Sequence, residues 1–229
     1  MNLIQTAPKG LNLIALLSII VLILKILFLN NLPALFHGAE ALGVIVEAVL
    51  ASIIASYVFY LIVVHLKELS DKKVIYPLVL KWSNLVVGDC SSQLAAISKE
   101  SGVYLKLDDI TEKKVKDAFS KLHPFGEAPL LLGATDIYAT WIQFLLWHRN
   151  RTNKYINKIL SQIIYVESEI ISKVVEIDDC SHFSQIEAVN GSGLIKNIDI
   201  SFMGSLFYKY CLLCKELKVL IDNSMEEYG

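Results

Sequence analysis

Two long apolar runs dominate the first third of the chain. The sequences "LNLIALLSIIVLILKILFL" (11–29) and "ALGVIVEAVLASIIASYVFYLIVVHL" (41–66) are apolar on almost every helical face. A helix needs roughly 20 such residues to cross the hydrocarbon core of a bilayer. The pattern therefore predicts an N-terminal transmembrane hairpin over residues 1–66, with spans at 11–29 and 41–66.

Basic residues near the span ends predict the orientation of this hairpin. The connection "NNLPALFHGAE" contains no Lys or Arg, whereas Lys9 precedes the first span and Lys67, Lys72 and Lys73 follow the second. Because short cytoplasmic segments carry an excess of Lys and Arg, we expect both termini on the cytoplasmic side. Residues 67–229 then form a cytoplasmic domain.

A cleaved signal peptide is the competing interpretation of residues 1–29. Lys9 and the small-x-small sequence "AEA" (39–41) favour it. The first apolar run, however, is longer than the core of a signal peptide, contains Lys25 and ends well before "AEA". A retained transmembrane span fits the pattern better.

Each predicted span contains one misplaced charge, Lys25 in the first and Glu47 in the second. In an antiparallel hairpin both lie about five or six residues from the outer ends, so they fall at nearly the same depth. Lys25 alone can extend its side chain to the interface. The other interpretations are a structural ion pair, a protonated Glu47, or a pair that faces a polar path through an oligomer.

Small and polar residues recur beside Glu47 at three- and four-residue intervals. They are Ala48, Ala51, Ser52, Ala55 and Ser56. Such small-residue patterns allow membrane helices to approach closely. The stripe either packs the hairpin against itself or joins several hairpins into a homo-oligomer.

The sequence pattern of residues 67–229 predicts a helical domain. We expect a helix after the second span, interrupted at Tyr76–Pro77 and ended by Gly102. A short amphipathic helix capped by Thr111 follows, then a loop over 123–136. A long helix over 137–177, capped by Thr135 or Asp136 and divided by a polar turn at "HRNRTNK", precedes a break at "VNGSGLIKN" and a last helix over 200–222. No segment alternates convincingly, so the predicted fold class is all-α, a hairpin followed by a helical bundle.

The sequence offers little sign of catalysis. It lacks a Gly-rich phosphate loop, HExxH, GxSxG and any carboxylate pair with catalytic spacing, so we expect neither an enzyme nor a cofactor. Cys180-x-His182 and Cys211-x-x-Cys214 have ligand chemistry, but Cys211 and Cys214 fall in an apolar helical stripe, which favours buried cysteines over a metal site.

Charge excludes a broadly basic nucleic-acid-binding domain, because 21 basic residues are balanced by 23 acidic ones. One local cluster stands out: Arg149, Arg151 and Lys154 in "RNRTNK". Guanidinium groups suit phosphate oxygens, so this cluster is a candidate for docking a partner or nucleic acid. A solvated helix face has the same appearance.

The layout resembles small bacterial two-transmembrane effectors of anti-phage systems, including those linked to retrons. The part that carries the resemblance is the junction "YVFYLIVVHLKELSDKKVIYP". The resemblance implies a multi-pass protein of the bacterial inner membrane, kept inactive by a partner complex, with membrane damage and abortive infection on release. It further implies a reverse transcriptase and a noncoding RNA/DNA complex as partners if the system is retron-linked.

Residue patterns alone leave a second function open. The hairpin can serve only as an anchor, with the cytoplasmic bundle acting as a sensor or scaffold that recruits a soluble effector. A phosphate-ester or nucleic-acid hydrolase has the least support, because no set of acid, base and metal ligands stands out.

Overall fold

The computed structural model describes residues 3–28, 30, 38–134, 136–192 and 198–228. The fold is mostly helical, with 81% helix and 4% strand, which confirms the predicted helical class. Two compact units, Met1–Val74 and Ile75–Gly229, divide the chain within helix α4 (Leu66–Ser101). The apolar pattern placed the junction earlier, at the end of the second run.

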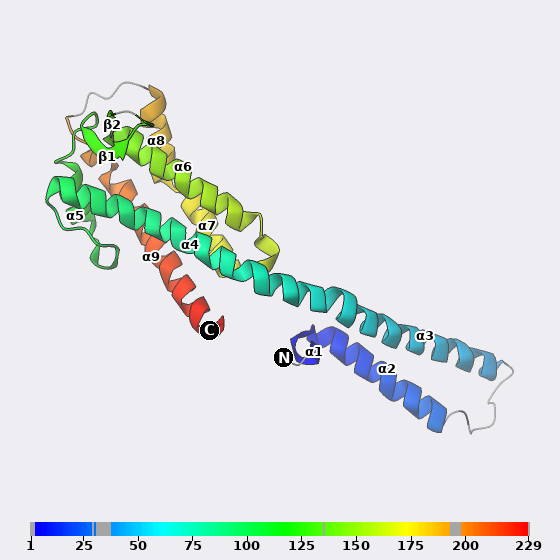
Figure 1. Cartoon of the computed structure of the whole chain (residues 1–229). Helices are drawn as coiled ribbons and strands as arrows, with labels where there is room; N and C mark the ends of the chain where they lie inside the picture. The colour runs from blue at the N-terminus through cyan, green and yellow to red at the C-terminus, as the bar shows by residue number, and fades with distance from the viewer. Residues whose placement is uncertain (1–2, 29, 31–37, 135, 193–197, 229) are drawn as a thin grey trace. The chain divides into compact units, whose positions relative to one another are not determined.

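The N-terminal unit is an apolar helical hairpin (Figure 1). It contains α1 (Leu3–Thr6), α2 (Lys9–Leu27) and α3 (Ala39–Phe59), which continues into the π-helical segment Tyr60–His65. Gly38 precedes α3 with φ +96°, a backbone conformation that glycine adopts without strain. The predicted loop between the runs falls largely on residues 31–37, and these lie outside the described residues together with Leu29.

Helix α4 enters the C-terminal unit and ends where the sequence predicts. Gly102 follows it with φ +69°. The predicted interruption at Tyr76–Pro77 is wrong, because the helix continues through Pro77. Tyr76 and Val79 are buried on either side of this proline, so packing holds the segment helical despite the missing backbone donor.

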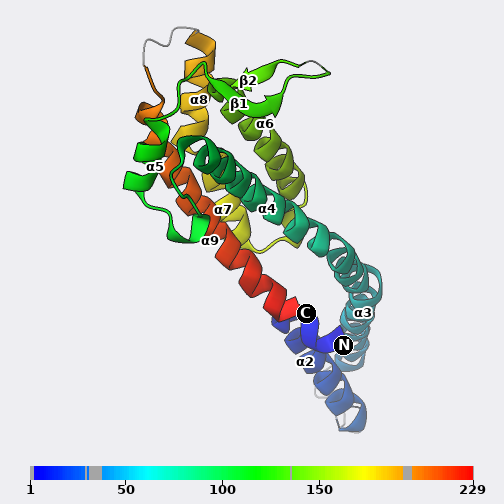
Figure 2. The same cartoon turned by 60° about the vertical axis from the view of Figure 1, so that its left-hand side comes forward.

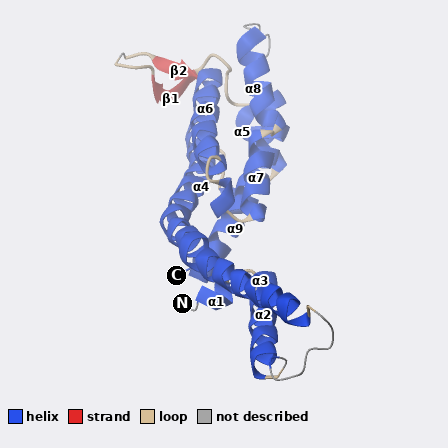
Figure 3. Cartoon of the chain, turned by 90° about the vertical axis from the view of Figure 1, so that its right-hand side faces the viewer, coloured by secondary structure: helices blue, strands red, loops and turns tan. Residues whose placement is uncertain are grey.

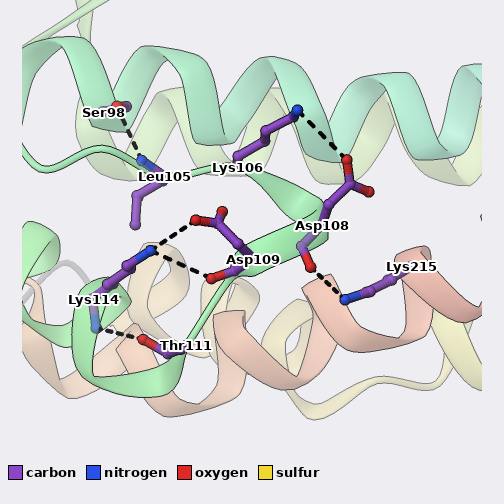
Figure 4. Close-up of polar contacts among 8 residues, drawn as sticks. All are labelled: Ser98, Leu105, Lys106, Asp108, Asp109, Thr111, Lys114 and Lys215. Atoms are coloured by element: carbon purple, nitrogen blue, oxygen red, sulfur yellow. Dashed lines mark hydrogen bonds and ion pairs between the residues drawn. The ribbon is translucent and has the colours of Figure 1, made fainter.

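Side-chain hydrogen bonds hold the connection from α4 to α5 (Glu112–Phe119) in place, as Figure 4 shows. Ser98 Oγ accepts the Leu105 N–H, and Lys215 Nζ donates to the Asp108 carbonyl at 2.6 Å. Thr111 caps α5 by accepting the Lys114 N–H, as predicted. These bonds fix an irregular segment between α4 and the last helix, α9 (Gly204–Tyr228).

A short antiparallel sheet replaces the loop expected over 123–136. Strands β1 (Glu127–Leu131) and β2 (Tyr138–Thr140) pair beside the start of the following helix, α6 (Trp141–Leu160), where Figure 3 shows them in red. The sequence did not predict this hairpin, because β1 contains Pro129 and its apolar and polar residues do not alternate. Gly133, with φ +65°, lies in the turn.

The long helix predicted over 137–177 is two helices, α6 (Trp141–Leu160) and α7 (Ser168–Asp178). Thr140 starts α6 through a capping box with Gln143, so the predicted cap Asp136 is not used, and the alternative Thr135 lies outside the described residues. The polar sequence "HRNRTNK" lies within α6 because His148 and Thr152 are buried there. The real break is the stretch 161–167, which contains the 3-10 turn Ile163–Tyr165.

The remaining helices enclose the core of the C-terminal unit. Helix α8 (Ser181–Ser192) packs on α6, and α9 (Gly204–Tyr228) packs on α5 and α7 (Figure 2). Large fully buried side chains meet between them, among them Phe119, Trp141, Ile156, Phe207 and Tyr210. The Phe119 and Phe207 ring centroids are 5.0 Å apart.

Candidate functional site

Three polar contacts join the two sides of the hairpin, two between α2 and α3 and one between α1 and the π-helical segment. Lys25 Nζ lies 2.6 Å from Glu47 Oε2. The Tyr57 hydroxyl donates to Asn12 Oδ1, and Thr6 Oγ1 lies 2.9 Å from His65 Nε2. The paired residue numbers sum to nearly the same value, as an antiparallel register requires. The structure therefore brings Lys25 and Glu47 together.

Small residues of α2 and α3 make room for this seam. Ala15 and Ser18 are buried on α2, on the same helical face as Lys25. The carbon stem of Lys25 crosses Gly43, with its Cε 3.5 Å from the position that a Cβ would occupy there. Lys25 is consequently only 8% exposed although it carries a charge.

Helix α3 faces α2 with a different set of residues from the predicted small stripe. Half-buried positions recur along one helical face, among them Gly43, Glu47, Leu50, Ile54 and Tyr57. The small stripe, which comprises Ala48, Ala51, Ser52, Ala55 and Ser56, is exposed. The interpretation that this stripe packs the hairpin against itself is therefore wrong, and the stripe remains a surface. Glu47 belongs to the face toward α2, yet 44% of its side chain is exposed next to the small stripe.

Both helices of the hairpin have the length and the apolar composition of a membrane span. Lys9–Leu27 and the continuous helix from Ala39 are long and apolar enough to cross a bilayer. Few of their side chains are buried, unlike those of a helix in the core of a soluble protein. Large apolar residues such as Leu13, Leu27, Val44 and Ile45 are more than half exposed.

A buried polar cluster in the C-terminal unit joins α4 to α6. Asp89 is fully buried and accepts from Thr152 Oγ1 at 2.6 Å, and it lies 2.8 Å from His148 Nδ1. Arg151 completes an ion pair with Asp89, and its guanidinium lies 4.6 Å from the centroid of the Trp147 ring. Because every interaction converges on one carboxylate, the cluster suits a structural role in holding the two helices together.

The three cations of "RNRTNK" do not act as one group in the structure. Arg149 pairs with Glu187 of α8 at 2.6 Å, and Arg151 pairs with Asp89 of α4. Lys154 is exposed. Two of the three candidate docking residues therefore contribute to packing within the unit.

Pattern reading missed the Asp89 cluster, although the sequence contains a signal for it. Asp89 occupies the same helical face as Val86, Cys90 and Gln93, all of which are buried. An acid on a buried face requires a partner. His148 and Thr152, one turn apart on α6, are that partner, but nothing in the sequence indicates that the two helices meet.

Three cysteines gather between α4 and α9. Cys90 Sγ lies 3.6 Å from Cys211 Sγ, and Cys214 is buried beside them. Burial raises the pKa of all three thiols, so they are protonated and poorly reactive at neutral pH. Burial likewise raises the pKa of Cys180 to about 11.

His182 lies in an aromatic pocket formed by Phe183, Phe207 and Tyr210. Its ring stacks on Tyr210 at 5.6 Å and meets Phe207 edge-on at 5.1 Å. Neither ring nitrogen has a hydrogen-bond partner among the described residues. Loss of hydration lowers the pKa of His182 to about 3. Within the described part of the chain, no group of three or more His, Cys, Asp or Glu side chains is arranged to hold a metal ion.

The distinctive features of the chain are thus the polar seam of the hairpin, the exposed small stripe beside Glu47, and a separate helical unit with its own core. No family model, curated protein or solved structure matches the chain.

Proposed function

We propose that the hairpin α2–α3 crosses the bacterial inner membrane twice, with both termini cytoplasmic, and that several copies associate to permeabilise the membrane. The observation that carries this proposal is the half-exposed carboxylate of Glu47 beside the exposed small stripe. Lys25 and Glu47 form a pair that is covered on one side only.

An acid on a lipid-facing surface is unfavourable. Insertion scales assign a charge at the centre of a span a penalty of about 2.5 to 3.5 kcal/mol. Lys25 offsets part of this penalty through its 2.6 Å contact, yet the carboxylate still faces outward. A second hairpin packed on the small stripe would cover Glu47 with protein, because Ala and Ser side chains let helix backbones approach closely.

Association along the stripe also places several Lys25–Glu47 pairs around one axis. Rings of charged side chains are a common means by which proteins line ion-conducting paths. The hydroxyls of Ser52 and Ser56 lie on the same surface and can bond across the seam between copies. The assembly would thus combine tight packing with a polar interior.

We further propose that this activity is that of an anti-phage effector, kept inactive by a partner complex until infection. The support is the resemblance of the two-span layout and its basic junction to such effectors. A reverse transcriptase with its noncoding RNA/DNA complex is the proposed partner of this class.

The test enlarges the small stripe without changing charge. Ala51→Leu/Ala55→Leu should block close approach of a second hairpin while leaving the α2–α3 seam intact, because neither residue lies in it. Val21→Phe, on an exposed position of α2, is the matched control for added bulk. Cells expressing each variant are followed for inserted protein, cross-linked oligomers and membrane potential.

The stripe variant should insert normally, lose its cross-linked oligomers and leave the membrane polarised, whereas Val21→Phe should depolarise cells as the native protein does. Depolarisation by the stripe variant at native level would contradict assembly through this face. Failure of the native protein to resist alkaline extraction from membranes would contradict insertion itself.

A membrane-anchored sensor or scaffold is the second candidate, and the β1–β2 hairpin favours it. Leu131, Ile137 and Tyr138 are 52%, 64% and 46% exposed on this hairpin. Exposed apolar side chains grouped on one small element are typical of a protein-docking surface. In this case the apolar hairpin only delivers the C-terminal unit to the membrane.

A further inference from the structure

An exposed apolar turn with basic neighbours lies at one end of the C-terminal unit. The turn is the 3-10 segment Ile163–Tyr165 between α6 and α7, and Ile163 and Ile164 are 53% and 80% exposed. Among the large hydrophobic residues described, only Ile198 is more exposed than Ile164. Two adjacent isoleucines in this state would ordinarily be buried or covered.

Contacts between α4 and α6 locate this turn within the unit. Asp89 meets His148 and Thr152, and further along Lys158 Nζ lies 5.9 Å from the centroid of the Trp82 ring. The two helices are therefore antiparallel, and α6 runs toward the start of the unit at Ile75. Figures 1 and 2 both show the α6–α7 connection beside the part of α4 that enters this unit.

The surroundings of the turn are positive and aromatic. Lys154 and Lys158 are exposed one turn apart on α6, and Lys158 lies near the rings of both Trp82 and Tyr155. No acidic residue occurs between positions 149 and 166, and the first that follow are Glu167 and Glu169. Lysines beside aromatic rings and exposed isoleucines are the composition found where proteins meet a membrane interface.

We propose that Ile163 and Ile164 insert into the surface of the membrane, with Lys154 and Lys158 binding anionic lipid headgroups. This inference rests on the proposed insertion of the hairpin. The chain advances nine positions from Leu66, at the end of the apolar run, to Ile75. Even fully extended they span at most about 32 Å, so the turn is tethered near the bilayer and weak contacts are sufficient.

The positive charge of Lys154 and Lys158 favours a lipid surface over other partners of the exposed turn. The cytoplasmic leaflet is anionic, and each lysine near it strengthens association about fivefold. Isoleucine side chains gain by entering the acyl boundary, whereas nucleic acid offers them no equivalent environment. The combination of isoleucines with lysines therefore favours a lipid surface over a single-stranded nucleic acid.

The test places a fluorescent probe at the turn of the full-length protein in vesicles. Ile164→Cys is labelled in a Cys180→Ser background, where the other thiols are buried. Ile137→Cys on the β1–β2 hairpin, with 64% exposure in the native chain, is the matched probe site. Vesicles contain a lipid-borne quencher in phosphatidylcholine alone or mixed with phosphatidylglycerol.

The probe at 164 should be quenched more strongly than the probe at 137, and only in vesicles with phosphatidylglycerol. Lys154→Gln/Lys158→Gln should abolish the difference, whereas Lys99→Gln/Lys113→Gln, at exposed lysines elsewhere in the unit, should leave it unchanged. Equal quenching at 164 and 137 in protein that resists alkaline extraction would overturn the inference and leave hairpin insertion standing.

Two further outcomes separate the alternatives. Extraction of the protein at alkaline pH means that the hairpin is not inserted, and both proposals then fail. Binding of a fluorescent oligonucleotide that Lys154→Gln/Lys158→Gln removes, with lipid quenching unaffected, would overturn the lipid assignment in favour of nucleic acid.

Discussion

His182 has lost its water without gaining a hydrogen-bond partner among the described residues, and this makes it sensitive to pH. Its pKa is lowered from 6.5 to about 3 because burial disfavours the charged ring. Below pH 6.5 the unfolded chain binds a proton that the folded chain does not. Stability therefore falls as pH drops from about 6.5 toward 3, and the penalty is absent above that window.

We expect the C-terminal unit to lose about 2 kcal/mol from this residue at pH 5 relative to pH 7.5. His182→Phe should remove that part of the pH dependence, since phenylalanine fits the aromatic pocket and does not titrate. Hydrogen exchange of α8 and α9 amides in the full-length protein in detergent measures the change. An identical pH dependence in both proteins would show that His182 stays hydrated or paired.

The sequence predicted the contacts of individual side chains less well than it predicted the helices. Thr111 as a cap and Gly102 as a helix end follow from local chemistry, and both are confirmed. Asp89 and His148 lie 59 positions apart in the sequence, so their contact depends on how α4 meets α6. Local patterns identify residues that need a partner but do not identify the partner.

The helix pair α2–α3 shows how a regular register turns two isolated charges into a contact. The apolar runs predicted both helices, and the shared depth of Lys25 and Glu47 follows from helical rise alone. Their side-by-side placement further requires a close seam, which Ala15, Ser18 and Gly43 provide. The sequence pattern did not predict the role of these small residues, because large apolar neighbours surround them in the sequence.

Removing one member of this pair should be worse than removing both. With the hairpin inserted as proposed, Lys25→Leu or Glu47→Leu would leave one charge in the hydrocarbon, at a penalty of the order of 2.5 to 3.5 kcal/mol, and should lower the amount of inserted protein. The double leucine variant removes the penalty and should insert normally. Protein that resists alkaline extraction is the quantity to measure, with expression level as its control.

Depolarisation by the double variant then separates two roles. If the pair is only structural, the double variant regains both insertion and membrane damage. If Glu47 lines a leak, the double variant inserts but leaves cells polarised, because an apolar constriction loses its water and stops ions. Native behaviour of all three variants would leave the pair without either role.

Helix boundaries in the C-terminal unit were harder to predict than those of the hairpin. Competing starts at Thr135, Asp136 and Thr140 have similar capping chemistry, and only pairing of β1 with β2 selects Thr140. Pro77 normally disfavours a helix, yet buried neighbours override it. Tertiary contacts of this kind act over distances that a local pattern does not sample.

Considered as a whole, the molecule joins two units with opposite surfaces through one helix. The N-terminal unit exposes apolar side chains along most of its length, whereas the C-terminal unit buries them in its own core. Each unit is compact in itself. An exchange of one unit is therefore a fair test of which one carries the activity.

Replacing residues 1–66 by an unrelated two-span hairpin should abolish membrane depolarisation if the native hairpin is the effector. The stripe beside Glu47 is then lost, while the C-terminal unit is still delivered to the membrane. If the hairpin is only an anchor, growth arrest should survive the exchange, because the exposed β1–β2 hairpin is still present to recruit a partner.

The junction decides whether this experiment can be interpreted. Helix α4 begins at Leu66 and runs without a break into the C-terminal unit, so the new span must join it in helical phase. A fusion with one extra residue turns the following helix by about 100° and serves as a control for junction effects. Arrest that persists in both fusions favours the anchor. Arrest lost in both, with normal insertion and an intact C-terminal unit by limited proteolysis, assigns the damage to the native hairpin.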